Sequence, residues 1–179
     1  KYWQVENEPF FTFGECPWRD KTFFKKEVQL VRKLDKGQRP ILMTESGELS
    51  TWFPAARTAD IVGVTMYRQT WWHKAGGFYA NYPLPPVHYW RKAKIIEKIF
   101  GKKVIVVELQ AEAWGPTPLY VLPIEAQKKI MDVQDFKNNI EYAKKTGFDT
   151  FYLWGAEWWY FLKVKHNESA IWEEAKKLW

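Results

Sequence analysis

Two glutamates, a hundred residues apart, each stand at the end of an apolar run. Glu8 closes the N-terminal run YWQVENEP, where Asn7 and Pro9 flank it, and Glu108 directly follows the run VIVV. A charge in that second position is costly unless the side chain has a partner or a chemical role. Cleavage of a glycosidic bond needs such a pair: one carboxylic acid protonates the leaving oxygen, and one carboxylate lies on the other side of the anomeric carbon. If two strands bring Glu8 and Glu108 to one rim, the chain has the residue types for that reaction.

Glutamates this far apart can meet only if regular elements position them, and the apolar pattern predicts alternating strands and helices. Strands are expected over the opening run and over 41–44, 61–66, 104–108 and 150–154. Helices are expected over 23–34, 49–58 and 87–100, from Asp132 or Asp135 to Gly147, and from an N-cap at Asn167 to Leu178. Two long segments are expected to be loops: 67–86, which is too polar and too rich in Gly and Pro for regular structure, and the segment that carries Trp114.

The predicted strands are nearly continuous apolar runs, which is typical of parallel strands covered by helices on both faces. We therefore expect an α/β fold with five parallel strands and covering helices. Both long loops follow strands and precede helices, so they lie on the rim at the C-terminal ends of the strands. In α/β barrels this rim carries the active site.

A chain of 179 residues fits one domain, here 1–179, with five strand-helix units of about thirty residues each. It is short for a closed eight-stranded α/β barrel, which usually needs about 250 residues. Because the first residues already belong to a strand, we expect the upstream part of a larger domain to be absent.

The composition argues against several functional classes. The formal charge of +6 comes mostly from scattered lysine doublets on predicted solvent faces or helix ends, so no nucleic-acid partner is expected. No apolar run approaches the roughly twenty residues that cross a bilayer, so we expect a soluble chain without a membrane partner. The compartment stays open, and secretion of the parent protein is one option. Cys16 is the only cysteine and can form no internal disulfide, whereas twelve tryptophans indicate an unusually aromatic core or a flat ligand.

Other catalytic arrangements find no support in the sequence. His73, His88 and His166 lie far apart without the spacing of metal ligands, so no metal site is expected. No glycine-rich phosphate loop follows a strand, because Gly76 and Gly77 sit in the middle of a predicted loop. The Gly-x-Ser-x-Gly turn of serine hydrolases is missing as well. We therefore expect no cofactor.

The run WQVENEP resembles the strand-four signature of the clan A glycoside hydrolases, which are TIM-barrel (β/α)8 enzymes with the acid/base on strand four and the nucleophile on strand seven. If Asn-Glu-Pro marks strand four, counting forward puts 104–108 on strand seven and 150–154 on strand eight. The resemblance covers essentially the whole chain. It implies a partial TIM barrel, the C-terminal portion of a glycosidase domain from strand four to the helix after strand eight, with the three N-terminal strand-helix units missing.

The resemblance implies a role for five residues. Glu8 is similar to the general acid/base of these enzymes, and Asn7 to the neighbour that hydrogen-bonds the sugar 2-hydroxyl. Glu108 is similar to the nucleophile, and Tyr67 to the tyrosine that holds the nucleophile carboxylate in family 5 cellulases and mannanases. Trp154 is similar to the strand-eight tryptophan that floors the subsite for the non-reducing sugar. Enzymes of this clan retain the anomeric configuration, which implies carboxyl groups about 5 Å apart.

Further site residues stay open at this point. Glu112 is the alternative nucleophile if strand seven runs longer than expected, and this chain has Thr65-Met66-Tyr67 where family 5 enzymes often carry His-x-Tyr. Glutamates on the rim could accept hydrogen bonds from sugar hydroxyls, or they could be surface or helix-capping groups. Tryptophans in the rim loops could stack on pyranose rings or pack the loops onto the barrel. These candidates are Glu45, Glu48, Glu157, Trp71, Trp72, Trp114, Trp158 and Trp159.

Two functions fit the sequence best. The first is a retaining β-glycosidase that acts on a plant or microbial polysaccharide, and the alternative is a carbohydrate-binding or truncated barrel module that does no chemistry. A doubly wound nucleotide-binding sheet fits the order of elements but lacks its phosphate loop. Because an open five-stranded sheet leaves two unpaired edges, we expect the isolated chain to be unstable, self-associating or inactive. Its expected partners are a carbohydrate substrate and either the missing N-terminal half of the barrel or a second copy.

Overall fold

The structure, a computed structural model, describes residues 1–11 and 20–179, apart from the side chain of Ala75; Cys16 lies outside this part. Its main sheet has five strands, all parallel, in the order β1-β2-β3-β6-β7. They are β1 (Trp3–Gln4), β2 (Ile41–Glu45), β3 (Ile61–Met66), β6 (Lys103–Gln110) and β7 (Phe151–Trp154). The predicted α/β fold with five parallel strands is confirmed.

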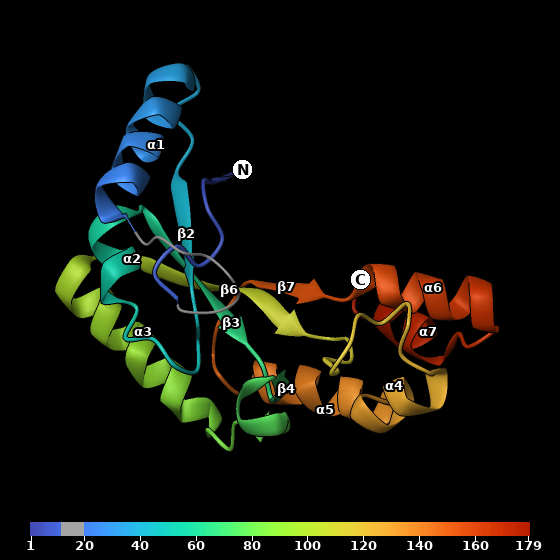
Figure 1. Cartoon of the computed structure of the whole chain (residues 1–179). Helices are drawn as coiled ribbons and strands as arrows, with labels where there is room; N and C mark the ends of the chain where they lie inside the picture. The colour runs from blue at the N-terminus through green and yellow to red at the C-terminus, as the bar shows by residue number, and fades with distance from the viewer. Residues whose placement is uncertain (12–19) are drawn as a thin grey trace.

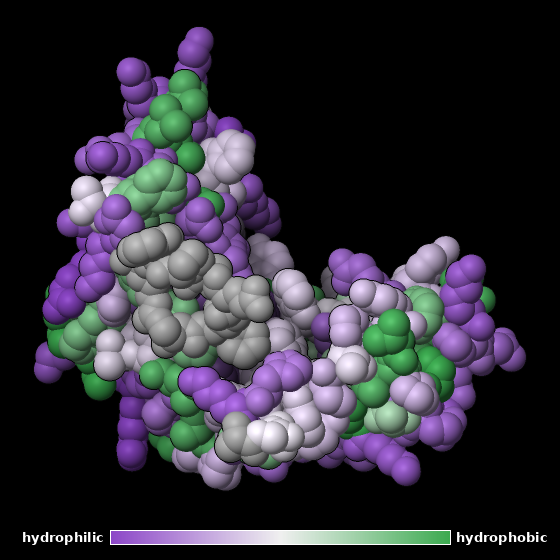
Figure 2. All heavy atoms as spheres, in the orientation of Figure 1, coloured by the Kyte–Doolittle hydropathy of each residue, from purple (hydrophilic) through white to green (hydrophobic). Residues whose placement is uncertain are grey.

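The strand order follows the chain order without a reversal, so each new strand is added to the same edge of the sheet. A doubly wound sheet would reverse direction part-way through this order. The helices of the described residues are α1 (Lys21–Leu34), α2 (Phe53–Thr58), α3 (Pro86–Phe100), α4 (Ile124–Ile130), α5 (Val133–Lys144), α6 (Ala156–His166) and α7 (Ala170–Lys176). Figure 1 shows them following one another around one side of the curved sheet. The molecule is a half-barrel flanked by helices, and its outline in Figure 2 has an open notch between α1 and α6.

The face of the sheet that meets the helices carries the hydrophobic core. Val62 and Val64 of β3 and Val106 of β6 pack in one cluster with Phe136 of α5 and Trp159 of α6. Burying a side chain of this size is worth about 1.5–3 kcal/mol. The contacts between the sheet and its helices therefore supply most of the stability, and they leave the other face of the strand ends free for polar residues.

Strand β6 contains one extra residue. Its pairing with β3 is regular up to Val106, but the next residue of β3, Thr65, pairs with Glu108, so that Val107 is skipped. The pairing with β7 also skips one residue of β6 before Leu109. Successive side chains of a strand point to opposite faces, and an inserted residue reverses the direction of those that follow. This β-bulge places Glu108 on the same face as Thr65 and away from the helix-packed Leu109.

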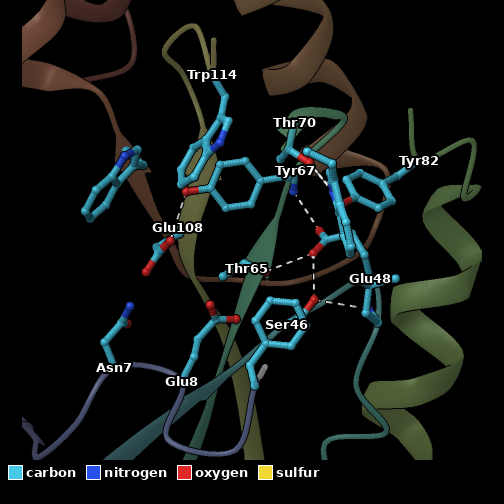
Figure 3. A pocket seen from close by; sticks show the side chains of 14 residues that line it. Asn7, Glu8, Ser46, Glu48, Thr65, Tyr67, Thr70, Tyr82, Glu108 and Trp114 are labelled. Carbon is cyan, nitrogen blue, oxygen red and sulfur yellow. Dashed lines mark hydrogen bonds between the residues drawn. The ribbon is translucent and has the colours of Figure 1, made fainter. Parts of the chain in front are cut away.

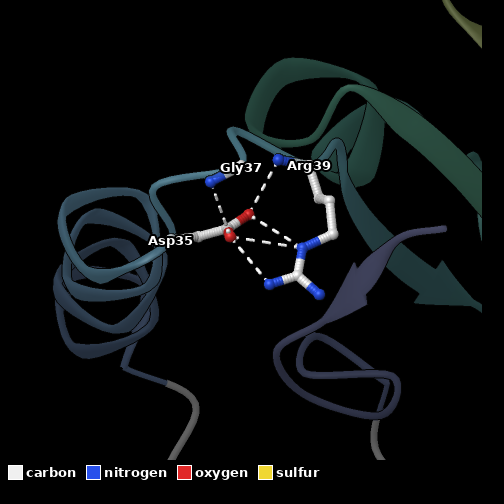
Figure 4. A network of polar contacts seen from close by, with 3 residues as sticks. All are labelled: Asp35, Gly37 and Arg39. Atoms are coloured by element: carbon white, nitrogen blue, oxygen red, sulfur yellow. Dashed lines mark hydrogen bonds and ion pairs between the residues drawn. The ribbon is translucent and has the colours of Figure 1, made fainter.

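A polar network holds the corner between α1 and β2 (Figure 4). Asp35, the C-cap of α1, accepts hydrogen bonds from the backbone N–H groups of Gly37 at 3.2 Å and Arg39 at 2.7 Å. The Arg39 guanidinium also donates to it at 2.7 Å, and these donors, the guanidinium above all, hold the pKa of the Asp35 carboxyl below its usual range. The same guanidinium lies 4.6 Å from the ring centre of Trp3. The network therefore ties the edge strand β1 to the turn that leads into β2.

The predicted loop over 67–86 is wrong, because most of it is a β-hairpin. Strands β4 (Gln69–Trp72) and β5 (Phe78–Asn81) pair antiparallel, with a 3-10 turn over Lys74–Gly76 between them. Gly77 has φ +87°, and a Cβ there would lie 2.3 Å from the Trp71 ring. Glycine is needed at this position for both reasons, so Gly77 closes the hairpin instead of interrupting it.

The C-terminal part also differs from the prediction. Helix α4 lies within the segment expected to be the second loop, and α6 follows β7 directly. Asn167, predicted as an N-cap, has φ +55° and is the C-cap of α6. Glu157, Trp158 and Trp159 were expected in a rim loop, but they lie in α6.

The two edge strands of the sheet remain open among the described residues. Strand β1 pairs only with β2, and β7 pairs only with β6. On β7, Tyr152 and Trp154 are 46% and 45% exposed. None of the helices in the described part of the chain is long and apolar enough to span a bilayer.

Candidate active site

A cavity of about 260 Å³ lies at the C-terminal ends of the parallel strands (Figure 3). Strand ends on the same side of a parallel sheet meet at one rim, so side chains from distant parts of the chain converge there. The structure brings eight of the candidate site residues to this cavity: Asn7, Glu8, Glu48, Tyr67, Trp72, Glu108, Trp114 and Trp154. The volume is near the small end of ligand pockets, about 300–1,000 Å³.

Glu8 is held in an unusual backbone conformation just after β1. Its φ is +43°, a left-handed value that costs a non-glycine residue about 1–3 kcal/mol and that is found preferentially at functional sites. Its backbone N–H donates to the Thr44 hydroxyl at 2.6 Å. The side-chain Oε1 is buried and has no hydrogen-bond partner among the described residues. Burial, followed by the charge of Glu108 and then those of Glu48 and Glu45, raises the pKa of Glu8 to about 8.

Glu108 lies across the cavity from Glu8 and has a different environment (Figure 3). The Tyr67 hydroxyl donates to its Oε2 at 2.9 Å. Burial raises the pKa of Glu108, and the Tyr67 hydrogen bond opposes that rise because it favours the charged form. Tyr67 is 7% exposed, and burial together with the charge of Glu108 raises its own pKa, so the phenol remains a hydrogen-bond donor. Glu8, with a pKa of about 8, therefore keeps its proton at neutral pH, whereas the Tyr67 hydrogen bond favours the charged form of Glu108.

A third carboxylate, Glu48, anchors the residues around this pair. It accepts hydrogen bonds from the Tyr67 backbone N–H at 2.6 Å, the Tyr89 hydroxyl at 2.8 Å and the Thr65 hydroxyl at 2.9 Å. A fourth bond comes from the Ser46 hydroxyl at 3.2 Å. Four donors are enough to hold a charged carboxylate in a partly buried position. Glu48 thereby fixes the backbone of Tyr67, and its negative charge raises the pKa values of both Glu8 and Glu108.

Among the described residues, the Asn7 amide has partners for its oxygen and none for its nitrogen. Asn7 Oδ1 accepts from Gln4 Nε2 at 3.0 Å and from the Thr44 hydroxyl at 3.2 Å. Its Nδ2 has no acceptor among the described residues, and Figure 3 shows this nitrogen directed toward Glu108. The side chain can therefore donate a hydrogen bond to a ligand bound between the two glutamates. Thr44, which orients both Asn7 and Glu8, was not predicted as a site residue from the sequence. Its place near the C-terminal end of a predicted strand could have indicated a position on the rim.

Two tryptophans complete the wall beside Glu108. Trp114 meets the Tyr67 ring edge-to-face, with 5.2 Å between ring centres. Trp154 donates its indole N–H to Glu112 Oε1 at 2.9 Å. Glu112 itself does not line the cavity among the described residues, and its carboxylate is engaged by Trp154. The structure therefore places Glu112 behind Trp154, a position that suits orienting the ring and does not suit the alternative nucleophile.

The remaining glutamate candidates lie elsewhere. Glu45 is 3% exposed and accepts the Ala55 backbone N–H at 2.6 Å, so it caps α2 inside the core and does not line the cleft. Burial raises its pKa. Glu157 is exposed on the first turn of α6, outside the residues that line the cavity.

The remaining tryptophan candidates divide between the core and the hairpin. Trp158 is 3% exposed and donates to Gln127, and Trp159 is also buried and donates to the Ala111 carbonyl, so both are core residues. The predicted substrate contact of Trp158 is therefore wrong. Trp72 lines the cavity, whereas Trp71 packs on Tyr79 on the other face of the hairpin.

The described lining of the cavity is acidic and contains no basic side chain. Glu8, Glu48 and Glu108 line it, and none of the described lining residues is lysine, arginine or histidine. Such a site repels phosphate groups and stabilises a cation that develops in a bound substrate. No cluster of three His, Cys, Asp or Glu side chains suited to a metal ion occurs within residues 1–11 and 20–179.

Comparison with models of known protein families gives no match to this chain, and no functionally characterised protein sequence matches it either.

Proposed function

We propose that this chain carries the catalytic pair of a retaining β-glycosidase of the clan A type, which acts on an oligosaccharide or polysaccharide. One observation carries the proposal: a carboxyl whose pKa is raised to about 8 and a carboxylate held by a tyrosine hydroxyl line the same small cavity. A glycosidase that acts near neutral pH needs one protonated carboxyl as the acid and one carboxylate as the nucleophile, and the surroundings of Glu8 and Glu108 favour this division.

In the first step, the Glu108 carboxylate attacks the anomeric carbon. The bond from that carbon to the leaving oxygen breaks while Glu8 transfers its proton to this oxygen. The product is a glycosyl ester on Glu108, and Glu8 is left as a carboxylate. In the second step, Glu8 takes a proton from water, the water oxygen attacks the anomeric carbon, and the ester bond to Glu108 breaks. Glu8 ends protonated and Glu108 ends as a carboxylate, so the cycle is complete.

The surroundings of the pair support this division of roles. The Tyr67 hydroxyl stabilises the charge that Glu108 needs for attack. The negative charge of Glu48 favours both the protonated form of Glu8 and the positive charge that develops on the sugar ring. Asn7 Nδ2 is free to donate to a sugar hydroxyl, and Trp154 lines the cavity next to Glu108. The strand order also agrees with strands four to eight of a TIM barrel.

A second candidate is a module that binds carbohydrate without cleaving it. It is favoured by the two open edges of the sheet, because residues from further strands would be needed to close the cavity on that side. Both candidates predict sugar binding, and they differ in whether a covalent bond to Glu108 forms.

Mechanism-based labelling separates the two. The chain is incubated with aryl 2-deoxy-2-fluoro-β-glycosides of glucose, mannose, xylose and galactose, in which the fluorine slows release of the glycosyl ester. Intact-mass spectrometry should show one added glycosyl group, and peptide mapping should place it on Glu108. Glu108→Gln should take no label. Glu112→Gln is the matched control and should still be labelled.

Label on Glu112 would reassign the nucleophile. If no probe labels the chain and yet sugar binding quenches its tryptophan fluorescence, the catalytic proposal fails and the binding module is the better description.

A further inference from the structure

The hairpin β4–β5 has one aromatic face that stabilises it and a second face that lines the cavity. Trp71 and Tyr79 are cross-strand partners, and their rings meet at 4.8 Å between centres. Side chains alternate along a strand, so Thr70 and Trp72 lie on the opposite face. Both line the cavity together with Tyr82, the first residue after β5.

The base of the hairpin is fixed to the strand that carries Glu108. Gln110, 1% exposed in β6, accepts with its Oε1 from the backbone N–H groups of Arg68 at 2.8 Å and Gln69 at 3.1 Å. Its Nε2 donates to the Gln69 carbonyl at 2.7 Å. These three bonds hold the hairpin in register with the proposed nucleophile, so its cavity face is preorganised.

Three polar groups on that face form a closed triangle (Figure 3 shows the hydroxyl-bearing side chains). The Trp72 indole N–H is shared between the Thr70 hydroxyl at 3.1 Å and the Tyr82 hydroxyl at 3.0 Å. The two hydroxyl oxygens are themselves 3.0 Å apart. One hydroxyl proton bridges the two oxygens, and the other has no acceptor among the described residues. The triangle therefore presents one uncommitted hydroxyl donor to the cavity, next to the apolar ring of Trp72.

We propose that this triangle is a subsite for the leaving-group sugar. The inference rests on the proposed glycosidase function and names the part of the substrate that the hairpin contacts. In the sheet order, Glu108 on β6 lies between the hairpin, which follows β3, and Trp154 on β7. In the proposed function, Trp154 lies beside the sugar that becomes bonded to Glu108. The hairpin lies on the other side of Glu108, where the leaving-group sugar would be. The preferred substrate is therefore an oligosaccharide whose leaving sugar accepts a hydrogen bond from the Thr70–Tyr82 pair.

The test compares two substrates of each sugar type: an aryl β-glycoside, whose leaving group has no sugar hydroxyl, and the corresponding disaccharide. Removing one hydroxyl leaves the other with its proton free, so Thr70→Val and Tyr82→Phe should each retain a donor. The double variant has no hydroxyl donor. Its ratio of kcat/KM for the disaccharide to kcat/KM for the aryl glycoside should fall about tenfold, as expected for one hydrogen bond. Thr70→Ser combined with Tyr82→Phe keeps one hydroxyl and should restore the ratio.

Tyr79→Phe, on the other face of the hairpin, is the matched control and should leave the ratio unchanged. An unchanged ratio in the double variant would overturn the proposal. Equal losses with both substrates, without rescue by serine, would also overturn it, because they indicate a structural role for the triangle.

A binding measurement separates this proposal from the catalytic one. Calorimetry with Glu108→Gln, which forms no glycosyl ester, measures the affinity for the same disaccharides with and without the double hydroxyl change. If wild-type chain cleaves neither substrate but the double change still weakens disaccharide binding about tenfold, the glycosidase function fails and the subsite stands. If binding is equally tight, the subsite is refuted whatever the activity.

Discussion

The raised pKa of Glu8 predicts that this residue lowers the stability of the folded chain at neutral pH. The carboxyl has a pKa of about 8 in the fold and an ordinary value of 4.5 when exposed. Between these values the unfolded chain releases the proton while the folded chain keeps it. The free energy of unfolding therefore falls as the pH rises from 4.5 to 8, and below 4.5 this contribution vanishes.

The size of the effect follows from the shift. Each pH unit in this window corresponds to about 1.4 kcal/mol, and pH 7 lies 2.5 units above the ordinary value of 4.5. Glu8 therefore costs up to about 3 kcal/mol at pH 7. Glu8→Gln has nearly the same shape but cannot ionise. We expect it to be more stable than the wild type by up to about 3 kcal/mol at pH 7, and by less than about 1 kcal/mol at pH 5.

Urea unfolding followed by tryptophan fluorescence at pH 5, 6, 7 and 8 measures this difference, with sedimentation used to keep the association state constant. Glu6→Gln, a change of an exposed glutamate two residues away, is the control and should follow the wild-type pH dependence. The same stability gain for Glu8→Gln at every pH, or none at any pH, would refute the reasoning, because Glu8 would then ionise normally in the fold. In the acid role proposed for it, Glu8 would exchange stability for activity, as functional residues often do.

Two further substitutions test the surroundings of the pair. Tyr67→Phe removes the hydroxyl that favours the charged form of Glu108, so the acid limb of the pH–rate profile should move to higher pH. We also expect kcat/KM to fall about 10–100-fold, which is the equivalent of about 1.5–3 kcal/mol for a hydrogen bond to a charged group. An acid limb that stays in place would speak against this role. Gly47→Ala would put a Cβ 1.8 Å from the Thr65 carbonyl oxygen and should lower the free energy of unfolding by roughly 2 kcal/mol or more. Gly37→Ala, whose Cβ would come no closer than 3.4 Å to any neighbour, should change it by less than about 0.5 kcal/mol in the same urea unfolding assay.

The convergence of the site was predictable from the sequence because it depends on coarse features. Apolar runs without polar alternation indicate parallel strands, and parallel strands bring their C-terminal ends to one rim. Glu8, Tyr67, Glu108 and Trp154 each follow or end such a run, so their meeting at one cavity required only the correct order of strands. Their roles in catalysis stay a prediction until the labelling experiment is done.

The hairpin and α6 could not be predicted in the same way. The segment 69–81 has two short runs of strand-forming residues around Gly76 and Gly77. This signal was outweighed by the glycine and proline content of the longer segment 67–86. Helix α6 has the sequence AEWWYFLKVKH, with apolar residues on nearly every side, so the helical period is hidden. Its helical state depends on contacts made by Trp158 and Trp159 with other parts of the fold.

The protonation state of Glu8 could not be predicted from the sequence either. It depends on three other glutamates, of which Glu45 and Glu48 follow a different strand and Glu108 lies a hundred residues away. Only the folded arrangement gives the distances and the burial that raise its pKa.

The extra residue in β6 makes this strand sensitive to its pairing register during folding. If β6 paired with β3 without the bulge, Val107 would lie opposite Thr65, and Glu108 would lie opposite Met66. The carboxylate would then point to the helix-packed face that Val64 and Val106 occupy. A chain that lacked Val107 could not make this error, because Glu108 would follow Val106 directly and would pair with Thr65 in regular alternation.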